Sequence, residues 1–276
     1  MSAAPDARVD LHLHSTASDG SLDPAALVEA AVAGGLDVIA LADHDTTAGV
    51  EPALAAAGGR VRIIPALEIS ASLDGADLHI LGYHVDPDDP ALSNYARGAA
   101  QRRATRAERI VGKLAGLGVA LEIGHVARVA GPGAVIGRPH IARALVERGA
   151  AGSVGEAFDR WLADDRPAFV PTGLASVAEA VTLIRGAGGV SVWAHPAPGD
   201  LTRLIDALIV AGVGGIEVFR PRVDARLVRR TRRLAEARDL LVSGGSDWHG
   251  EWHGPLGAFA VPAERIRALL ASGPEL

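Results

Sequence analysis

Short apolar runs alternate with alanine-rich helical patterns along most of this 276-residue chain. The apolar runs have the length of buried strands, and the segments between them repeat with the period of about 3.6 residues that is typical of helices. The expected strands lie at residues 9–14, 37–42, 61–69, 190–195, 215–219, 240–244 and 258–261. The expected helices lie at residues 23–34, 47–57, 176–187, 201–211, 223–238 and 263–271. This alternation predicts βαβ units around a parallel sheet, and we expect the sheet to close into a barrel.

One connection breaks the alternation. Asp74-Gly75 separates two apolar runs and predicts a β-hairpin after the third strand. From about residue 90 to residue 165 the pattern is wholly helical, with glycines and a proline between its helices. We therefore expect an α/β barrel domain formed by residues 1–86 and 171–276, and an inserted helical subdomain of residues 87–170 that lies over the functional site.

Histidines and carboxylates occur where the expected strands end. His12 and His14 are two residues apart on the first strand, so both imidazoles point to the same side. Later strands end in Asp43-His44-Asp45, Glu68, His195 and the pair Asp247 and His249. In parallel α/β folds the C-terminal ends of the strands form the functional face. Because metal sites are built from imidazoles and carboxylates that converge on one point, the pattern predicts a metal site at this face.

The composition narrows the class of protein. The chain has no cysteine, which excludes disulfides, thiolate metal sites and cysteine nucleophiles. Its only lysine, Lys113, leaves almost no place for Schiff-base chemistry or a Walker-type phosphate loop. The net charge of -6 argues against binding nucleic acid over a broad surface. No apolar run approaches the roughly 20 residues that span a bilayer, and the first residues show no signal-peptide pattern, so we expect a cytoplasmic protein.

These motifs, in this order, resemble those of the polymerase and histidinol phosphatase (PHP) family of metal-dependent phosphoesterases. The motifs are His12-x-His14 with Asp19, Asp43-His44-Asp45, Glu68, His79, Ala194-His195-Pro196 and Gly245-Ser246-Asp247-x-His249. Within the family, the segment from Ile136 to Ile141, which contains Gly137-Arg138-Pro139-His140, closely resembles the branch of nucleoside 3',5'-bisphosphate phosphatases and 5'-3' exoribonucleases (ribonuclease AM). The resemblance covers nearly the whole chain and implies a distorted seven-stranded (β/α) barrel that binds three divalent metal ions.

By this analogy, three groups of residues hold the metals. The first group is His12, His14, Glu68 and Asp247; the second is Glu68, His79 and His195; the third is Asp19, His44 and His249. Glu68 would bridge the first two metals and, with Asp247 and His195, form the catalytic centre. A carboxylate bridge holds two metals roughly 3.5 to 4 Å apart, close enough to share a hydroxide nucleophile and to clamp a phosphoryl group. Asp43 and Asp45 flank His44 and are expected to orient ligands rather than to bind metal.

The nitrogen and oxygen ligands suit several divalent metals. Since the set contains many histidines, it favours manganese, iron or zinc over magnesium, and we expect manganese. Three divalent ions would add about +6 to a chain whose net charge is -6. Without that charge, a phosphate dianion would meet an acidic pocket.

The helical insert carries an expected anion site. Gly137-Arg138-Pro139-His140 opens a helical pattern, and proline in the first turn is a helix-start signal. A helix N-terminus offers free backbone N–H groups, to which arginine adds a bidentate fork. We therefore expect Arg138 and His140 to bind a substrate phosphate. The alternative is an ordinary capped helix with an exposed arginine.

Other histidines and arginines have simpler interpretations. His84 and His125 are expected to be structural, and the role of His253 is left open. Arginines share one helical face at positions 102, 106 and 109, and again between Arg226 and Arg233. For both faces a solvated surface is favoured over an RNA track.

The expected function is a phosphoesterase that holds a nucleotide 5'-phosphate and cleaves the phosphoester on the 3' oxygen. This one reaction would remove the 3'-phosphate from a nucleoside 3',5'-bisphosphate or release nucleotides from the 5' end of short RNA. The alternatives are a histidinol-phosphate-type phosphatase and a PHP module in a nucleic-acid-processing assembly such as a polymerase. An amidohydrolase-type barrel also begins with His-x-His, but there a carboxylated lysine commonly bridges the metals, whereas here Glu68 occupies that strand end. No membrane and no obligate protein partner are expected.

Overall fold

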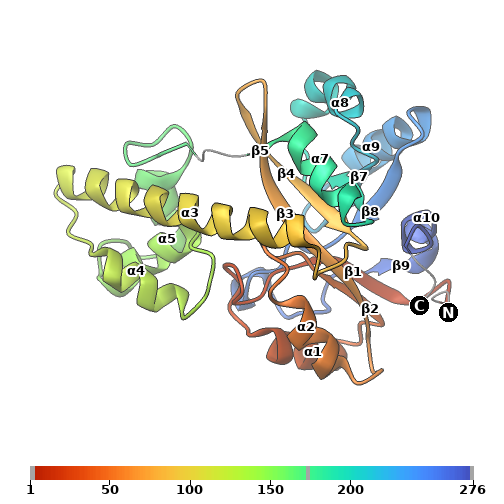
Figure 1. Cartoon of the computed structure of the whole chain (residues 1–276), viewed down its shortest axis with the longest axis horizontal. Helices are drawn as coiled ribbons and strands as arrows, with labels where there is room; N and C mark the ends of the chain where they lie inside the picture. Colours follow the sequence, from red (N-terminus) through yellow and green to blue (C-terminus); the bar gives the residue numbers. More distant parts are fainter. Residues whose placement is uncertain (1–3, 172–174, 274–276) are drawn as a thin grey trace.

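Seven strands form a nearly closed barrel at the centre of the protein (Figure 1). The computed structural model describes residues 4–171 and 175–273. The barrel strands are β1 (Arg8–Leu13), β2 (Val38–Leu41), β3 (Arg62–Leu73), β4 (Ala76–Tyr83), β6 (Val190–Trp193), β7 (Gly215–Phe219) and β8 (Leu241–Gly244). They follow the order β8-β7-β6-β4-β3-β2-β1, and Trp248, which follows β8, completes the circle by a bridge to Leu13. The predicted α/β class and distorted seven-stranded barrel are confirmed.

The barrel is distorted because β4 runs antiparallel to both of its neighbours, β3 and β6. The predicted hairpin joins β3 to β4, and its turn residues Asp74 and Gly75 have φ of 50° and 80°. Two positive φ values are typical of the two-residue turn that fits the twist of paired strands. The hairpin partner β4 thus enters the barrel between two strands that would otherwise be parallel neighbours.

Two short strands lie outside the barrel circle. The strand expected at residues 258–261 is only the two-residue β9 (Val261–Pro262), which pairs with the start of β1. Pro262 has no N–H with which to extend this pairing. The other short strand, β5 (Ala175–Ser176), pairs with the far end of β3.

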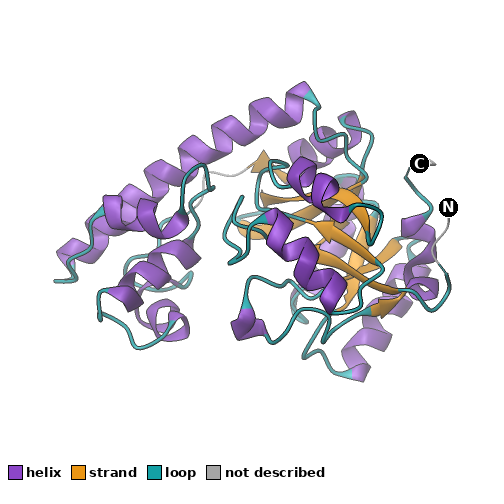
Figure 2. Ribbon diagram, turned by 90° about the horizontal axis from the view of Figure 1, so that it is seen from below, coloured by secondary structure: helices purple, strands orange, loops and turns teal. Residues whose placement is uncertain are grey.

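Helices cover the outside of the barrel close to the positions predicted from the sequence, and Figure 2 shows the strands enclosed by them. These helices are α1 (Pro24–Ala33), α2 (Val50–Ala57), α7 (Val177–Gly186), α8 (Asp200–Val210), α9 (Ala225–Ala237) and α10 (Arg267–Leu270), which follows the 3-10 turn Ala263–Ile266. The local sequence determines where two of these helices begin. Asp23 caps α1 ahead of Pro24, and Ser176 with Glu179 forms the capping box of α7.

The remaining helices form the insert between β4 and β5. They are α3 (Pro90–Gly116), α4 (Ile123–Ala130), α5 (Arg138–Glu147), α6 (Val154–Ala157) and a π-helical turn (Phe158–Leu162). Figure 1 shows α3 extending away from the barrel with α4 and α5 beside it. The insert has a hydrophobic core of its own, which includes Leu114, Leu145 and Leu162. None of the helices in the described ranges is both long enough and apolar enough to span a bilayer.

The separate core supports the division into a barrel domain and a helical subdomain at 87–170, but the boundaries themselves stay a prediction. Residues 1–3, 172–174 and 274–276, which the predicted barrel ranges include, lie outside the described residues.

His84 ties the end of β4 to the C-terminal helix, as expected for a structural histidine. Its ring Nε2 lies 3.0 Å from the carbonyl oxygen of Leu269, and its φ is 60°. Burial lowers the pKa of His84 below its ordinary value, so the folded state favours the neutral ring. Below the ordinary pKa of about 6.5 the unfolded chain takes up the proton more readily, and stability is lost as the pH falls.

We therefore predict that His84→Asn makes the unfolding free energy less dependent on pH below about 6.5, since asparagine tolerates the positive φ but does not titrate. Denaturant unfolding of the metal-free protein on both sides of that pH measures this dependence. An unchanged slope would show that His84 does not favour its neutral form in the folded protein.

Candidate metal centre

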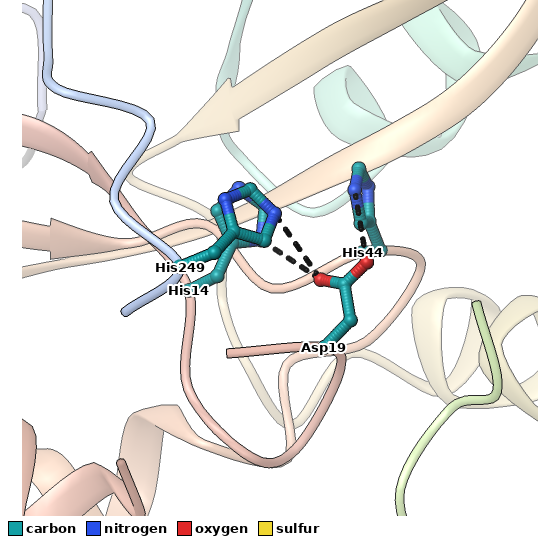
Figure 3. Close-up of side chains that lie close together, drawn as sticks. All are labelled: His14, Asp19, His44 and His249. Carbon is teal, nitrogen blue, oxygen red and sulfur yellow. Dashed lines mark ion pairs between the residues drawn. The ribbon is translucent and has the colours of Figure 1, made fainter. Parts of the chain in front are cut away.

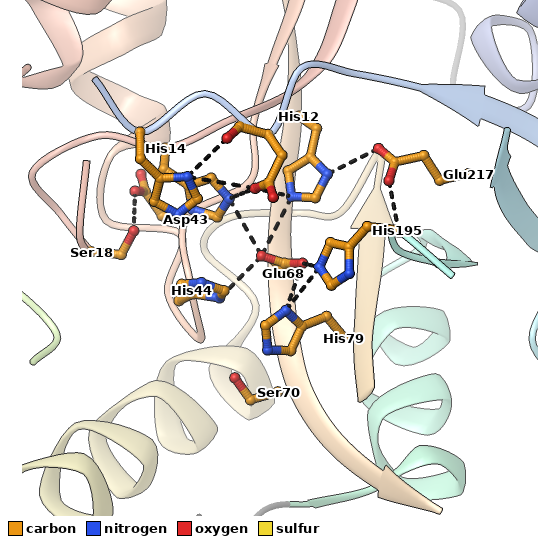
Figure 4. Close-up of polar contacts among 12 residues, drawn as sticks. His12, His14, Ser18, Asp43, His44, Glu68, Ser70, His79, His195 and Glu217 are labelled. Atoms are coloured by element: carbon orange, nitrogen blue, oxygen red, sulfur yellow. Dashed lines mark hydrogen bonds and ion pairs between the residues drawn. The ribbon is translucent and has the colours of Figure 1, made fainter. Parts of the chain in front are cut away.

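All nine residues expected to bind metal come together at one end of the barrel. Figure 4 labels six of them, which are His12, His14, His44, Glu68, His79 and His195. His12 lies on β1, Glu68 on β3 and His79 on β4, while the others are in the loops that follow β1, β2, β6 and β8. For the residues near the ends of the parallel strands the convergence follows from topology, because the C-terminal ends of parallel strands meet at the same edge. His79 instead reaches the cluster from the antiparallel β4.

Glu68 is at the centre of the cluster and its side chain is fully buried. Its Oε2 lies 3.4 Å from His12 Nε2, 3.3 Å from His14 Nε2 and 3.0 Å from His44 Nδ1. Its Oε1 lies 3.0 Å from both His79 Nδ1 and His195 Nε2. One carboxylate therefore approaches five imidazoles, an arrangement suited to a ligand shared by two cations.

The cluster divides into groups that could each hold a metal ion. The groups are His12, His14, Glu68 and Asp247; His44, Glu68 and His79; and His14, Asp19, His44 and His249. Figure 3 shows the last of these, with Asp19 between His44 and the pair His14 and His249.

Two of these groups differ in detail from the expected ligand sets. His44 belongs to the group of Glu68 and His79 as well as to the group of Asp19. His14 belongs to the group of Asp19 as well as to the group of His12. His195, expected in the second set, lies 3.0 Å from both His79 Nδ1 and Glu68 Oε1.

Several buried polar atoms of the cluster have no hydrogen-bond partner among the described residues. They are His12 Nε2, His14 Nδ1 and Nε2, Asp19 Oδ1, His44 Nδ1 and Glu68 Oε2. A protein rarely leaves buried polar atoms unpaired, because each costs free energy. Metal ions would satisfy these atoms, so the residues present fit divalent cations.

The carboxylates of the cluster are ionised and His44 is neutral, as metal ligation requires. Burial opposes ionisation of Asp19, but the imidazoles of His44 and His249 hold its pKa well below the ordinary value. Burial also opposes ionisation of Glu68, but neighbouring imidazoles hold its pKa well below the ordinary value, and His79 has the largest effect among them. Burial lowers the pKa of His44 to about 3, so this ring is neutral near pH 7 and has a lone pair to donate. Burial opposes protonation of His249, but Asp19 and Asp247 raise its pKa to about 9, so a metal ion bound there must displace a proton.

The backbone is unusual at several residues of the site. His195 and Asp247 have φ of 29° and 54°, in the left-handed region that few residues other than glycine adopt. Just before Asp247, a Cβ on Gly245 would lie 2.3 Å from His12 Cβ. Only glycine fits there, because β8 passes directly against the strand that carries His12.

Glu217, which the sequence analysis did not identify, holds two of these residues in place. Its Oε1 accepts a hydrogen bond from His12 Nδ1 at 2.9 Å, and its Oε2 accepts one from the backbone N–H of His195 at 2.7 Å. The bond at Nδ1 turns His12 Nε2 toward Glu68 and Asp247. A lone acid within the apolar run Gly215–Phe219 was the available signal.

Asp43 and Asp45, expected to orient ligands, bind the polypeptide around the site. Asp43 accepts bonds from the Ser15 backbone and hydroxyl at 2.8 and 2.7 Å and from the Ser18 hydroxyl at 2.6 Å, which fixes the loop that carries Asp19. Asp45 instead accepts a bond from Arg103 Nε on α3 at 2.7 Å, which joins the insert to the barrel. Neither carboxylate has a hydrogen bond to the His44 ring among the described residues.

Arg138 and His140 start α5, as predicted, and this helix end lies against the cluster. The position of a Cβ on Gly137 is 3.0 Å from Asp19 Oδ2. His140 Nδ1 accepts the Gly137 N–H at 2.9 Å, and burial lowers the pKa of His140 to about 4. Arg138 Nη1 donates to Asp164 Oδ1 at 2.6 Å and stays inside the insert.

The predicted solvated face of α3 is wrong for Arg106. Arg102 and Arg109 are exposed, but Arg106 is 8% exposed and its Nε donates to the carbonyl oxygen of Val170 at 2.7 Å. Its Nη2 is buried with no partner among the described residues. Burial, with repulsion from Arg138 and Arg103, lowers the pKa of Arg106 to about 10.

His125 and His253, which are not among the expected metal ligands, lie at different distances from the cluster. His125 bonds to Glu147 at 2.8 Å within the insert, which fits a structural role. The ring of His253 lies 5.7 Å from that of His249, beside the cluster but outside its three groups.

The barrel and the cluster together define a (β/α)-barrel protein whose clustered imidazoles and carboxylates could hold metal ions. Comparison with known families narrows this class. The PHP domain matches residues 10–152, and the chain belongs to the PHP domain family, as the resemblance predicted.

Relatives are similar over most of their length. The chain is 35% identical over 254 residues to a 3',5'-nucleoside bisphosphate phosphatase of Chromobacterium violaceum, covering 90% of this chain and 89% of the relative. It is 34% identical over 248 residues to the 5'-3' exoribonuclease Rnm of Escherichia coli, covering 87% and 84%. The crystal structure of a candidate metal-dependent phosphoesterase from Bifidobacterium adolescentis matches with a TM-score of 0.87 at 32% identity, covering 97% of each chain. The expected class of enzyme, a hydrolase of phosphoesters, is confirmed.

Proposed function

We propose that this protein hydrolyses the 3' phosphoester of nucleoside 3',5'-bisphosphates and of short 5'-phosphorylated RNA, which it degrades from the 5' end. The observation that carries the proposal is the position of the N-terminal end of α5 against Asp19, beside a cluster fit for metals. One phosphate can then be anchored by the insert while another is at the cluster. The names of the relatives from C. violaceum and E. coli support both substrates.

We assign the metal ligands as the resemblance implied. His12, His14, Glu68 and Asp247 would hold the first ion, Glu68, His79 and His195 the second, and Asp19, His44 and His249 the third. With no sulfur ligand among them, manganese is our first choice, then iron, zinc or magnesium. When bound, such ions supply Lewis-acid activation of the phosphoester and of water. Glu68, Asp247 and His195 are the proposed catalytic residues, and Glu217 positions His12.

The chain itself supplies the anchor for the 5'-phosphate. The N-terminal end of α5 favours an anion, and Arg138 and His140 stand in its first turn. Arg106 adds a buried guanidinium N–H with no partner among the described residues, close enough to Arg138 for mutual repulsion. A phosphate between these two arginines would relieve that repulsion. A cytoplasmic location is part of the proposal, and a protein partner is not.

We predict that Arg138→Ala lowers kcat/KM by roughly 30- to 1000-fold for substrates with a 5'-phosphate and has little effect on those without it. Steady-state kinetics on adenosine 3',5'-bisphosphate and adenosine 3'-monophosphate provide the comparison. Asp164→Asn is the matched control, because it removes the partner of Arg138 and leaves the guanidinium free for phosphate. Equal losses of Arg138→Ala on both substrates would show that Arg138 contacts the reacting group or supports only the fold.

A competition among phosphoesters tests the function as a whole. Nucleoside 3',5'-bisphosphates and short 5'-phosphorylated RNAs are expected to react far faster than histidinol phosphate or aryl phosphates, because an empty buried anion site leaves its donors unpaired. Product identification must show cleavage at the 3' oxygen, with weak discrimination among bases. Release of the 5'-phosphate, or histidinol phosphate as the best substrate, would overturn the proposal. Elemental analysis of the same preparation counts and identifies the metals.

A further inference from the structure

A second basic region lies outside the metal centre, along α9. A groove of about 620 Å³ runs beside this helix, and we call it the α9 groove. Its arginines are Arg220, Arg229, Arg232, Arg233 and Arg265. Phe219 and Phe259 add aromatic side chains to the lining, and Glu236 is its one carboxylate.

The positive charge of the groove is largely uncompensated. Glu236 pairs with Arg232 at 2.9 Å. Within residues 4–171 and 175–273, no carboxylate lies within ion-pair distance of Arg229 or Arg233. Arg265 instead lies over the ring of Phe219 at 5.5 Å. In a protein of net charge -6, such a concentration of arginine attracts anionic ligands to this surface.

Arg220 connects the groove to the rim of the metal centre. It directly follows β7, the strand that carries Glu217, and its Nη2 donates to the carbonyl oxygen of Pro196 at 2.9 Å. Pro196 is the residue after His195. The Nε of Arg220 is buried and has no partner among the described residues, so it can donate to a bound acceptor.

The groove and the proposed 5'-phosphate anchor are on opposite sides of the cluster. Figure 4 shows His195 and Glu217 on one side of Glu68, and His14 and His44 on the other. Figure 1 shows the insert and α9 at opposite ends of the molecule. A strand anchored at the insert and cleaved at the cluster would therefore continue toward His195 and Arg220.

We propose that the α9 groove binds the backbone phosphates of an RNA substrate on the 3' side of the cleaved bond. This rests on the proposed function. Arginines contact phosphates without reading sequence, and aromatic side chains accept any base by stacking. The sequence analysis favours a solvated surface for Arg226 to Arg233. For Arg229 and Arg233 we propose the alternative, an RNA track. A nucleoside bisphosphate has no nucleotide beyond the cleaved bond and makes no use of the groove.

The double variant Arg229→Ala, Arg233→Ala tests the proposal. On a 5'-phosphorylated RNA decanucleotide, kcat/KM is expected to fall roughly 10-fold at low salt, and less on a dinucleotide. The slope of log kcat/KM against log salt concentration should become less negative by about 1.4, because two phosphate contacts are lost and each contributes about 0.7 on a single strand. Hydrolysis of adenosine 3',5'-bisphosphate should be unchanged.

The same helix offers a matched control. Arg226 and Arg230 are exposed on α9 but do not line the groove. Arg226→Ala, Arg230→Ala removes the same charge and should leave all substrates unaffected, whereas Arg229→Lys, Arg233→Lys should retain most of the RNA activity. The proposal would be overturned if both alanine pairs lowered kcat/KM on RNA equally. It would also be overturned if the loss for Arg229→Ala, Arg233→Ala did not grow with the length of the RNA. Failure of the unaltered enzyme on the bisphosphate would instead overturn the proposed function.

Discussion

Glutamine in place of Glu68 is expected to lower turnover by at least roughly 100-fold and to reduce the bound metal. Both oxygens of Glu68 face imidazoles, with His12, His14 and His44 on one and His79 and His195 on the other. Glutamine keeps the shape but removes a negative charge that two cations would share. Elemental analysis after dialysis, together with kcat on a nucleoside 3',5'-bisphosphate, measures both effects.

A graded series of glutamate variants makes this result specific. Glu217→Gln alters the partner of His12 Nδ1 rather than a proposed ligand, so metal affinity should fall by roughly 10- to 100-fold. Glu122→Gln, at an exposed position of the insert, should change neither metal content nor turnover. Chelator-treated wild-type protein should lose activity and regain it with manganese. Full activity in Glu68→Gln would remove this residue from the centre of the mechanism.

The positions of the expected metal ligands could be predicted because they depend on a local rule. His12 and Asp247 lie at or just after the ends of their strands, and Glu68 lies beside His44, just past the end of β2, although β3 itself continues to Leu73. The fold brings these positions together whatever the details of packing. His79 is the exception, since it lies on the antiparallel β4, and periodicity alone would not have placed it in the cluster. The family resemblance supplied that residue.

Residues whose role depends on long-range contacts were not predictable in this way. The helical period of α3 identifies its faces but not which face meets the barrel, and so Arg106 was assigned to solvent. The start of α5 was predicted from Pro139, whereas the pairing of Arg138 with Asp164 depends on how two segments of the insert fold together. In each case the tertiary packing decides the partner.

The largest stability effect is expected from Arg103, through which α3 binds the barrel. Arg103 and Asp45 form a buried ion pair, with exposures of 7% and 1%. Arg103 Nε lies 2.7 Å from Asp45 Oδ2, and its Nη2 donates to the Ser70 hydroxyl. The other oxygen of Asp45 accepts bonds from the Ser70 N–H and the Tyr95 hydroxyl at 2.8 and 2.6 Å. This network is complete only while the arginine is present.

Arg103→Ala should lower the unfolding free energy by about 3–5 kcal/mol, because it leaves the carboxylate of Asp45 buried without its cation. Urea unfolding of the metal-free protein separates this loss from any change in metal binding. Arg102→Ala, at the exposed neighbouring position, removes the same charge and a cation–π contact with Tyr95, and should cost no more than about 1 kcal/mol. Adding Asp45→Asn to Arg103→Ala should recover part of the loss, since the uncompensated charge is then absent. If the Arg103 and Arg102 variants were equally stable, the contact between α3 and the barrel would not depend on this ion pair.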